Sequence, residues 1–424
     1  MVISLVEVED IVDQLVRGDI KFHEIEELVG GDANIATKIR RIALEKITNK
    51  DLSSLVSTTL DFNELCGRNI ESPVGSVEIP IGIVKIKVKG DYANDLYYFA
   101  LATTEGALVA SVNRGCSAIN EGGNEGGGAR AKVYRDQMTR APVFSCGNVE
   151  NAFKLKTWVE EHFDEIKKLC ESTTRHGKLI KISPYLVGDT VFLRFIFTTG
   201  DALGMNMVTI ATEAGVNFIM ENLPFLRCVA LSGNLCADKK PAAINFIEGR
   251  GKSVIAEATI PREIVEKTLK TTPEAICEVN LRKNFMGSAV GQSPGFNAHF
   301  ANMIAAAFIA YGQDVAQTVE SSLGITTTFT TPEGDLYASV TLPCLEVGTI
   351  GGGTRLPKQR KLLELLSCEG GGVPPGTNAL KFAEILSAVV LGGELSLIAA
   401  LAAGHLAKAH RKLRRREKVT VKSF

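Results

Sequence analysis

The run of small and apolar residues from Asn378 to Leu413 constrains the fold more than any other segment. Its length and periodicity predict one long helix, and Ala298–Ser321 predicts a second helix of the same kind. A membrane span needs about 18 nearly charge-free residues, whereas the most apolar stretch, 382–404, contains Glu384 and Glu394. We therefore expect both helices to pack in the core of a soluble protein, where alanine and glycine let helix backbones approach closely.

Charge and cysteine content exclude several classes of protein. The 47 lysines and arginines balance 48 acidic residues, which leaves no net positive charge to attract nucleic acid. The nine cysteines form no CxxC pair, and acidic residues come too early for a signal peptide. No motif such as HExxH indicates a metal site. We expect a cytoplasmic protein that binds neither metal nor membrane. The basic block Arg411–Arg416 is either a solvated helix end or an anion-binding tail.

The distribution of helical and strand patterns predicts an α+β fold in three parts. Residues 1–50 have helical spacing and form an N-terminal region. Residues 142–228 contain two predicted strands and two predicted helices, which suits a small inserted domain. Residues 51–141 and 229–424 then form a large α/β domain around the long helix.

Two segments approach nucleotide-binding motifs without matching them. Phe246 stands where the first glycine of a P-loop is required, so the backbone there cannot cradle phosphates. Gly126–Ala131 fits GxGxxA, but a helical pattern precedes it where a dinucleotide fingerprint needs a strand. A flexible loop explains Gly126–Ala131 better.

Polar residues are dense between Leu231 and Lys252, although the surrounding residues are small or apolar. Asp238, Lys239 and Lys240 adjoin one another in this segment. A surface turn would explain these charges. The alternative is an oxyanion site, in which a lysine ammonium stabilises negative charge developing on a carbonyl oxygen.

Four further ionisable residues each allow two interpretations. Asp314 lies among apolar residues as either a helix-surface residue or the partner of a buried lysine. Glu105 either caps a helix or donates a proton with a raised pKa. His405 and His410 are about 140° apart on a helix, so at most one faces a given site.

Together these segments resemble class I 3-hydroxy-3-methylglutaryl-CoA (HMG-CoA) reductase. The similarity covers residues 71–410 and rests on ATTEG (102–106), GDALGMNM (200–207), SGNLCADKKPAAINFIEGRGKS (232–253), GQD (312–314), GTIGGGT (348–354) and GELSL…AALAAGHLAKAH (393–410). ESPVG (71–75) resembles the dimerisation segment of class I, although Ser72 and Pro73 depart from its commonest wording.

This resemblance implies NADPH-dependent, four-electron reduction of HMG-CoA to mevalonate and CoA through mevaldehyde, for isoprenoid synthesis. It also implies a ferredoxin-like NADP(H)-binding domain at 142–228 and a homodimer or dimer of dimers with the active site at the interface. Lys239 would stabilise the oxyanion within a charge network of Asp314 and Glu105, and Glu105 would also donate a proton in the second reduction. His410 would protonate the departing CoA thiolate, which leaves His405 a packing or partner contact.

The remaining site residues are carried over from matching positions. The predicted HMG contacts are Arg140, Ser232, Asp238, Lys240, Lys283 and Asn302. The predicted CoA contacts are Ser111, Asn113, Arg114 and Lys270. The predicted NADPH contacts are Thr174, Arg175, His176, Asp201, Leu203, Gly204, Met205 and Asn206, with Arg414 and Arg415 joining Arg175 at the 2′-phosphate.

Some positions depart from the family pattern. The loop Asn120–Gly128 is longer than usual, Ser117 replaces a basic residue, and His176 stands where an aromatic ring is common. Arg416 replaces a serine that is phosphorylated in some animal members, and we expect an archaeal-type enzyme without a membrane anchor. Two other functions stay open: an acyl-CoA thioesterase or acyltransferase using Cys236, and a non-catalytic CoA-binding scaffold.

Overall fold

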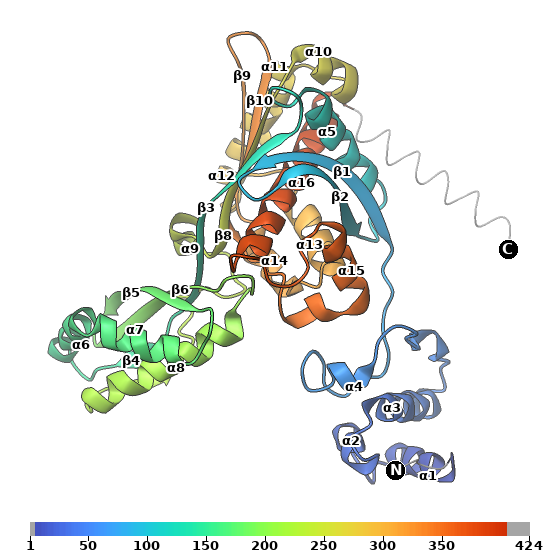
Figure 1. The fold of residues 1–424 in the computed structure, drawn as a ribbon, viewed down its shortest axis with the longest axis vertical. Helices are drawn as coiled ribbons and strands as arrows, with labels where there is room; N and C mark the ends of the chain where they lie inside the picture. Colours follow the sequence, from blue (N-terminus) through green and yellow to red (C-terminus); the bar gives the residue numbers. More distant parts are fainter. Residues whose placement is uncertain (1–4, 405–424) are drawn as a thin grey trace. The chain divides into compact units, whose positions relative to one another are not determined.

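The computed structural model describes residues 5–404, and its helices and strands are shown in Figure 1. Its internal contacts divide the chain into two compact units. The first unit consists of Met1–Pro80 with Arg355–Gln359, and the second of Ile81–Thr354 with Arg360–Phe424. The division into three domains predicted above is a different partition and stays a prediction.

The first unit is helical, and its helices are α1 (Leu5–Arg17), η1 (Phe22–Glu24), α2 (Ile25–Leu28), α3 (Ala33–Thr48), η2 (Ser53–Leu55) and α4 (Phe62–Leu65). The Asp32 carboxylate caps α3 by accepting hydrogen bonds from the backbone N–H groups of Asn34 and Ile35. Val12 of α1, Ile25 of α2 and further apolar side chains of α3 form one buried cluster. The unit therefore has its own small core.

The strands of the second unit form one mixed sheet. They are β1 (Ile81–Gly90), β2 (Asn94–Ala102), β3 (Ala129–Arg140), β4 (Val143–Ser145), β5 (Lys178–Val187), β6 (Thr190–Thr198), β7 (Arg227–Ala230), β8 (Gly251–Ile260), β9 (Ile325–Thr330) and β10 (Leu336–Leu345). The main path runs β7-β4-β6-β3-β8-β10-β9. β3 is long enough to pair with β8 over residues 130–137 and with β6 over 138–140, so it links two regions of the sheet (Figure 1).

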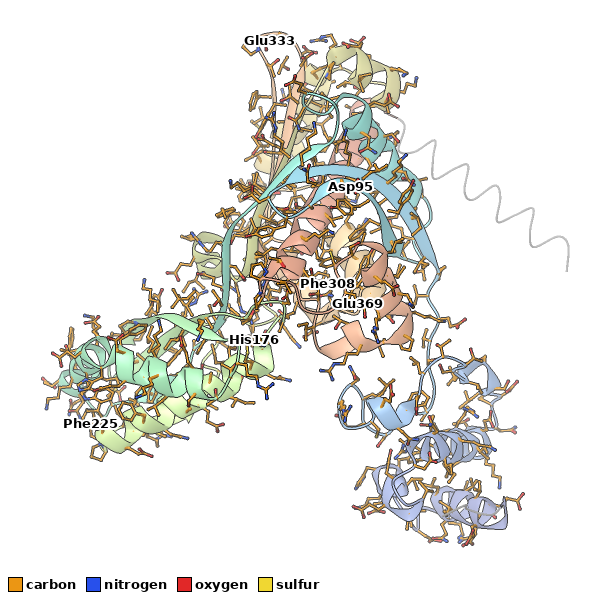
Figure 2. The ribbon with its side chains drawn as sticks, in the orientation of Figure 1. Asp95, His176, Phe225, Phe308, Glu333 and Glu369 are labelled. Carbon is orange, nitrogen blue, oxygen red and sulfur yellow. The ribbon has the colours of Figure 1, made fainter. Side chains whose placement is uncertain are left out.

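Each of these two regions has its own hydrophobic core. The helices are α5 (Leu108–Gly122), α6 (Val149–Glu161), α7 (Phe163–Ser172), α8 (Met205–Asn222), α9 (Ala243–Glu248), α10 (Arg262–Ile264), η3 (Val265–Leu269), α11 (Pro273–Val279), η4 (Asn280–Gly287), α12 (Ser288–Val290), α13 (Phe300–Ala310), η5 (Val315–Gln317), α14 (Thr318–Ser321), η6 (Gly352–Arg355), α15 (Pro357–Leu365) and α16 (Thr377–Ala402). The larger core surrounds α16, and the second lies among α6, α7, α8, β5 and β6. Figure 2 shows Phe308 among the side chains of the larger core. It shows Phe225 at the far end of the segment that contains the second core.

Residues 142–228 contain more elements than the two strands and two helices that were predicted. β4 and β7 are only three and four residues long, which is too short for a clear alternating pattern. α6 and α7 meet at His162 without a glycine or proline between them, so the apolar period continues across the break. The prediction of a mixed α+β fold is confirmed.

α16 is the predicted long core helix, but it ends at Ala402, before the predicted end at Leu413. By length and mean hydropathy it is apolar enough to cross a bilayer, contrary to the expectation that its two glutamates would prevent this. However, 83% of its most apolar window is buried inside the fold. At Gly115 of α5, an added Cβ would lie 1.8 Å from the backbone oxygen of Gly392, so these helices touch through their backbones.

The two buried glutamates of α16 hold neighbouring backbone segments. Glu384 accepts hydrogen bonds from the N–H groups of residues 91–93 at 2.7–3.1 Å. Glu394 accepts from the N–H groups of Ala298 and His299 at 2.8 and 2.7 Å, and from the Thr326 hydroxyl at 2.6 Å. Buried carboxylates are tolerated when hydrogen bonds satisfy them. The apolar helix can therefore carry both glutamates inside the core.

The second predicted long helix is wrong in its extent. α13 ends at Ala310, and the chain then turns at Gly312, whose φ of +66° ends the helix. The Gln313 side chain holds this turn by exchanging hydrogen bonds of 2.9 Å with the backbone of Gly348. Asp314 consequently lies beyond the helix, at the start of η5.

Candidate active site

The loop between β7 and α9 carries Lys239 in a strained conformation. Asn234, Ala237 and Lys239 all have positive φ values, between +51° and +63°. Such angles cost a residue other than glycine roughly 1–3 kcal/mol each, and they cluster at functional sites. The Lys239 N–H donates to Glu320 Oε1 at 2.8 Å, which fixes the backbone at one of these strained positions. The loop is therefore more than a simple surface turn.

The Lys239 ammonium forms an ion pair with Asp314. The Nζ–Oδ2 distance is 2.9 Å, and the two side chains are 44% and 40% exposed. The other oxygen of Asp314 accepts the Ala316 N–H at 3.1 Å, so the carboxylate caps η5 and cannot turn away freely. The hydrogen bond that the ammonium donates to Asp314 raises the pKa of Lys239 and keeps the ammonium charged. The predicted lysine–aspartate pair is thus present, but it lies at the surface and is not buried.

Arg250 at the start of β8 lies beneath the Lys239 loop and is completely buried. Its Nη1 contacts Glu320 Oε1 at 2.6 Å and also pairs with Glu346 Oε1, and its Nη2 contacts Asp238 Oδ1 at 3.0 Å. Glu320 and Glu346 are themselves fully buried. The guanidinium therefore joins the Lys239 loop to α14 and to the end of β10.

Neither Glu320 nor Glu346 was identified from the sequence. Each is a lone acidic residue in an apolar or small-residue context, VESS and CLEVG, which is the same signal that singled out Glu105 and Asp314. Together with Asp238 they place three carboxylate oxygens within 4.8 Å of one another, a spacing that would suit a metal ion. The cation among them in this structure is Arg250, which contacts all three.

The Asp238 carboxylate contacts Arg250 and not the ammonium groups of the neighbouring lysines. Its Oδ1 also accepts a hydrogen bond from Gln317 Nε2 at 2.9 Å. Burial raises the pKa of Asp238, but Arg250 and Gln317 outweigh burial and lower it overall. Lys240 is exposed and contacts only the backbone oxygen of Asp238, at 3.4 Å. Asp238 is therefore an ionised carboxylate facing the same loop as Lys239.

Two other predicted substrate residues surround Cys236. The Arg140 guanidinium donates to the Thr209 hydroxyl at 2.9 and 2.7 Å, and the Ser232 hydroxyl lies 3.5 Å from the Cys236 sulfur. Cys236 itself is completely buried. A nucleophile must reach the thioester carbon, so this burial counts against the alternative in which Cys236 is an acyl-transfer nucleophile.

Glu105, Lys283 and Asn302 lie apart from the ion pair. Within residues 5–404, no hydrogen bond or ion pair joins any of them to Lys239 or Asp314. Glu105 is exposed in the loop between β2 and α5, and its N–H donates to Thr103 Oγ1 at 3.0 Å. The capping interpretation is wrong, because α5 begins at Leu108 after Ala107.

Three of the four predicted CoA residues have side chains that bond to neighbouring parts of the fold, and the fourth is exposed. The Ser111 hydroxyl lies 2.9 Å from that of Ser396, and Arg114 donates to the Ser396 hydroxyl and backbone oxygen at 3.1 and 2.5 Å. Asn113 bonds the backbone of β1. These three side chains attach α5 to its neighbours, whereas Lys270 is exposed.

The predicted NADPH residues gather around the N-terminus of α8. Gly204, at φ +91°, precedes the helix, and no side chain caps its first turn. Thr174 donates to the Met207 sulfur at 2.8 Å and accepts the Gly177 N–H, and Arg175 and His176 beside it are exposed. Figure 2 shows His176 at the end of this segment opposite Phe225.

Asp201 has a structural role that its motif did not reveal. It is only 4% exposed, and its carboxylate accepts hydrogen bonds from the N–H groups of Gly372, Gly376 and Ala379 at 2.9, 2.7 and 3.0 Å. Its carboxylate therefore holds the segment before α8 against the start of α16. Its predicted contact with NADPH stays a prediction.

His410, Arg414 and Arg415 lie outside the described residues, as does His405. Their predicted roles at the thiolate, the 2′-phosphate and a packing contact therefore stay predictions.

Comparisons with known proteins agree with one another. A family model described as hydroxymethylglutaryl-coenzyme A reductase matches residues 36–415. The 3-hydroxy-3-methylglutaryl-coenzyme A reductase of Pyrococcus horikoshii is 55% identical over 410 residues, covering 96% of this chain and 98% of the relative. The 3-hydroxy-3-methylglutaryl-coenzyme A reductase of Methanocaldococcus jannaschii is 50% identical over 412 residues, covering 96% of this chain and 99% of the relative.

A solved structure shares the fold. The class II 3-hydroxy-3-methylglutaryl-CoA reductase of Streptococcus pneumoniae bound to NADPH superimposes with a TM-score of 0.64 at 18% identity, covering 91% of this chain and 98% of that one. The family model covers most of the chain, and the two archaeal relatives are matched over nearly their whole length. The chain therefore belongs to the hydroxymethylglutaryl-coenzyme A reductase family.

Proposed function

We propose that this protein is a class I, cytoplasmic HMG-CoA reductase that converts HMG-CoA to mevalonate and CoA through mevaldehyde, using two NADPH. Archaeal relatives of this name match along almost the whole chain, and ESPVG at 71–75 resembles the class I dimerisation segment. The observation that carries the chemistry is the Lys239–Asp314 ion pair at 2.9 Å, whose half-exposed ammonium can reach a bound substrate.

The direct test is an absorbance assay of purified protein with HMG-CoA and NADPH. The expected result is oxidation of two NADPH for each CoA released, with mevalonate as the product. Release of CoA without NADPH oxidation would indicate a thioesterase, and binding of CoA without turnover would indicate a scaffold. Either outcome would reject the proposal.

Lys239 is the proposed oxyanion-stabilising residue. Bound NADPH supplies the hydride in each reduction. When hydride adds to the thioester carbonyl carbon, negative charge develops on the oxygen, and a nearby ammonium stabilises it. Asp314 keeps that ammonium protonated and directs it, because its carboxylate is itself fixed by the Ala316 N–H. Lys239 then polarises the aldehyde oxygen in the second reduction.

Proton transfers are assigned to Glu105 and His410. His410 protonates the thiolate sulfur as CoA leaves, and Glu105 donates a proton to the alkoxide of the second reduction. The HMG carboxylate and hydroxyl are held by Arg140, Ser232, Asp238 and Lys240, together with Lys283 and Asn302, which make no hydrogen bond to the Lys239–Asp314 pair within residues 5–404 of their own chain. CoA is bound by Ser111, Asn113, Arg114 and Lys270 on α5 and after η3.

We place NADPH on residues 142–228, with its pyrophosphate at the N-terminus of α8. A helix of 18 residues whose first turn has no side-chain cap is suited to an anion, because the backbone N–H groups of that turn lack intrahelical acceptors. Thr174, His176, Leu203, Gly204, Met205 and Asn206 surround this helix end. The residues present therefore fit the cofactor.

Replacing Arg175 with alanine is expected to raise the KM for NADPH about tenfold or more, because a charged hydrogen bond to the 2′-phosphate is lost. The KM for NADH, which lacks that phosphate, should change little. Steady-state kinetics with both cofactors provides the measurement, and Arg414→Ala and Arg415→Ala test the tail in the same way. Arg227→Ala, at another exposed arginine of the same segment, is the matched control. An equal rise for both cofactors would contradict the assignment.

We propose a homodimer, or a dimer of dimers, in which the active site is completed across the interface. Glu105 is exposed and does not contact Lys239 within its own chain, so a partner chain is the proposed source of the glutamate at each lysine. Mixing and refolding equal amounts of inactive Glu105→Gln and Lys239→Ala chains should then restore about one quarter of wild-type activity, since half of the dimers are mixed and each has one intact site. No recovery would place both residues in one chain.

A further inference from the structure

Two carboxylate oxygens beneath the Lys239 loop are buried without a hydrogen-bond partner. They are Oε2 of Glu320 and Oε2 of Glu346. The Oε1 atom of each residue contacts Nη1 of Arg250, and both side chains are completely buried. The two orphaned oxygens therefore belong to one cluster, on α14 and directly after β10.

The charge of this cluster does not balance if every carboxylate is ionised. Asp238, Glu320 and Glu346 would carry three negative charges against the single positive charge of Arg250. Desolvation in a buried site is too costly for so many unpaired charges, and carboxylates that share a site hold a proton between them. The carboxyl groups of Glu320 and Glu346 are close enough for a hydrogen bond between their side chains. One proton shared between them would satisfy the orphaned oxygens and remove one negative charge.

Glu346 is the residue that holds this proton more readily. Burial raises the pKa of Glu320 as well, but the hydrogen bond from Glu346, the charge of Arg250 and the Lys239 N–H, which Oε1 accepts at 2.8 Å, each act to lower it. Burial raises the pKa of Glu346 well above its usual range. The groups that face it are Arg250 from β8, Glu320 from α14, Asp238 from the Lys239 loop, and Cys344 from β10, whose thiol stays neutral because burial raises its pKa to about 12.

We propose that Glu346 is a neutral carboxylic acid that donates a hydrogen bond to Glu320 and, through it, positions Lys239 for the reduction. One oxygen of Glu320 then accepts the N–H of the strained Lys239. The other oxygen of Glu320 accepts the hydrogen bond that Glu346 donates. Arg250 completes the support by contacting Asp238 on the same loop. The role in reduction rests on the proposed function, whereas the shared proton is independent of it.

The direction of the pH dependence follows from this assignment. The folded-state pKa of Glu346 lies above its unfolded value, so its folded form favours low pH. The stability and the Lys239 geometry that depend on the shared proton are fully present below the unfolded pKa. Both diminish as pH rises through the folded pKa, when Glu346 ionises beside Glu320.

Infrared spectroscopy of the full-length protein tests the proton directly. The wild type should show a carboxylic acid C=O stretch at neutral pH that disappears in Glu346→Gln. Glu248→Gln is the matched control, because Glu248 pairs with another buried arginine, Arg194, at 2.9 Å but has no second carboxylate beside it. This control should leave the band unchanged. If Glu346→Gln does not fold, Glu320→Gln serves instead, since an amide at 320 removes the need for the shared proton.

Kinetics tests the positioning role. Glu346→Gln retains a neutral hydrogen-bond donor, so kcat should stay within about tenfold of wild type, with the alkaline decline caused by Glu346 removed from the pH profile. Glu346→Leu should lower kcat about 100-fold, because a small displacement of a reacting group has effects of that size. Equal losses in both variants, or no carboxylic acid band in the wild type, would overturn the proposal. A wild type that shows the band but does not oxidise NADPH with HMG-CoA would reject the proposed function alone.

Discussion

Replacing Lys239 with alanine is expected to lower kcat for HMG-CoA reduction about 10³-fold, at the upper end of what the loss of one oxyanion donor causes in other enzymes. The ammonium carries the charge that stabilises the oxyanion, and the neighbouring Lys240 contacts only the backbone of Asp238 and cannot replace it. The change should leave the fold intact, because both Lys239 and its partner Asp314 are at least 40% exposed. NADPH oxidation gives the rate, and thermal unfolding checks the fold.

A matched control separates this effect from a general loss of positive charge. Lys267 is 71% exposed on η3 and pairs with Glu121 at 3.5 Å, so Lys267→Ala should retain wild-type kcat. A Lys239→Ala enzyme that keeps more than about a tenth of wild-type kcat would contradict the oxyanion role, because such a small effect matches an ordinary hydrogen bond.

Replacing Arg250 with leucine is expected to destabilise the protein by about 3–5 kcal/mol, the usual effect of removing one partner from a buried ion pair. Leucine would leave Glu320 and Glu346 fully buried without a cation, and Asp238 without its guanidinium contact. Their burial penalty would then be uncompensated. Equilibrium unfolding in denaturant measures the loss, and the variant should also lose activity because the Lys239 loop loses its support.

The control for Arg250 is an arginine with two acidic partners at the surface. Arg262 pairs with Glu274 and with Glu266, and its side chain is 38% exposed. Arg262→Leu should change the free energy of unfolding very little, because water solvates the glutamates that remain. Similar losses in both variants would show that burial of the Arg250 cluster is not the cause.

The family, the two residues of the Lys239–Asp314 ion pair and the central helix could be predicted from the sequence. Long motifs such as SGNLCADKKPAAINFIEGRGKS fix residue types and order, which is enough to identify a family. Asp314 was singled out because a carboxylate in an apolar context needs a partner, and Lys239 was assigned by its resemblance to the family motif. The structure places them 2.9 Å apart. α16 was predicted because its apolar periodicity extends over seven turns, which no loop sustains.

The contacts of these residues could not be predicted. The sequence placed Asp314 inside a helix and left open whether it was exposed or paired with a buried lysine, whereas a positive φ at Gly312 ends that helix and the pair is partly exposed. Asp201 was assigned to NADPH because its motif matched, but its carboxylate is occupied by backbone N–H groups about 170 residues later in the chain.

The sequence by itself therefore determined which segments are buried and which family the chain belongs to. Both follow from periodicity and motif order, which are properties of consecutive residues. The tertiary structure alone decided that Arg250, Glu320 and Glu346 meet beneath Lys239, and that Asp201 holds a loop. Arg250 is separated in the chain from Glu320 by 70 residues and from Glu346 by 96. Only the pairing of β8 with β10 and the packing of α14 bring their charges together. Electrostatic energy depends on distance in space, and no local pattern encodes that distance.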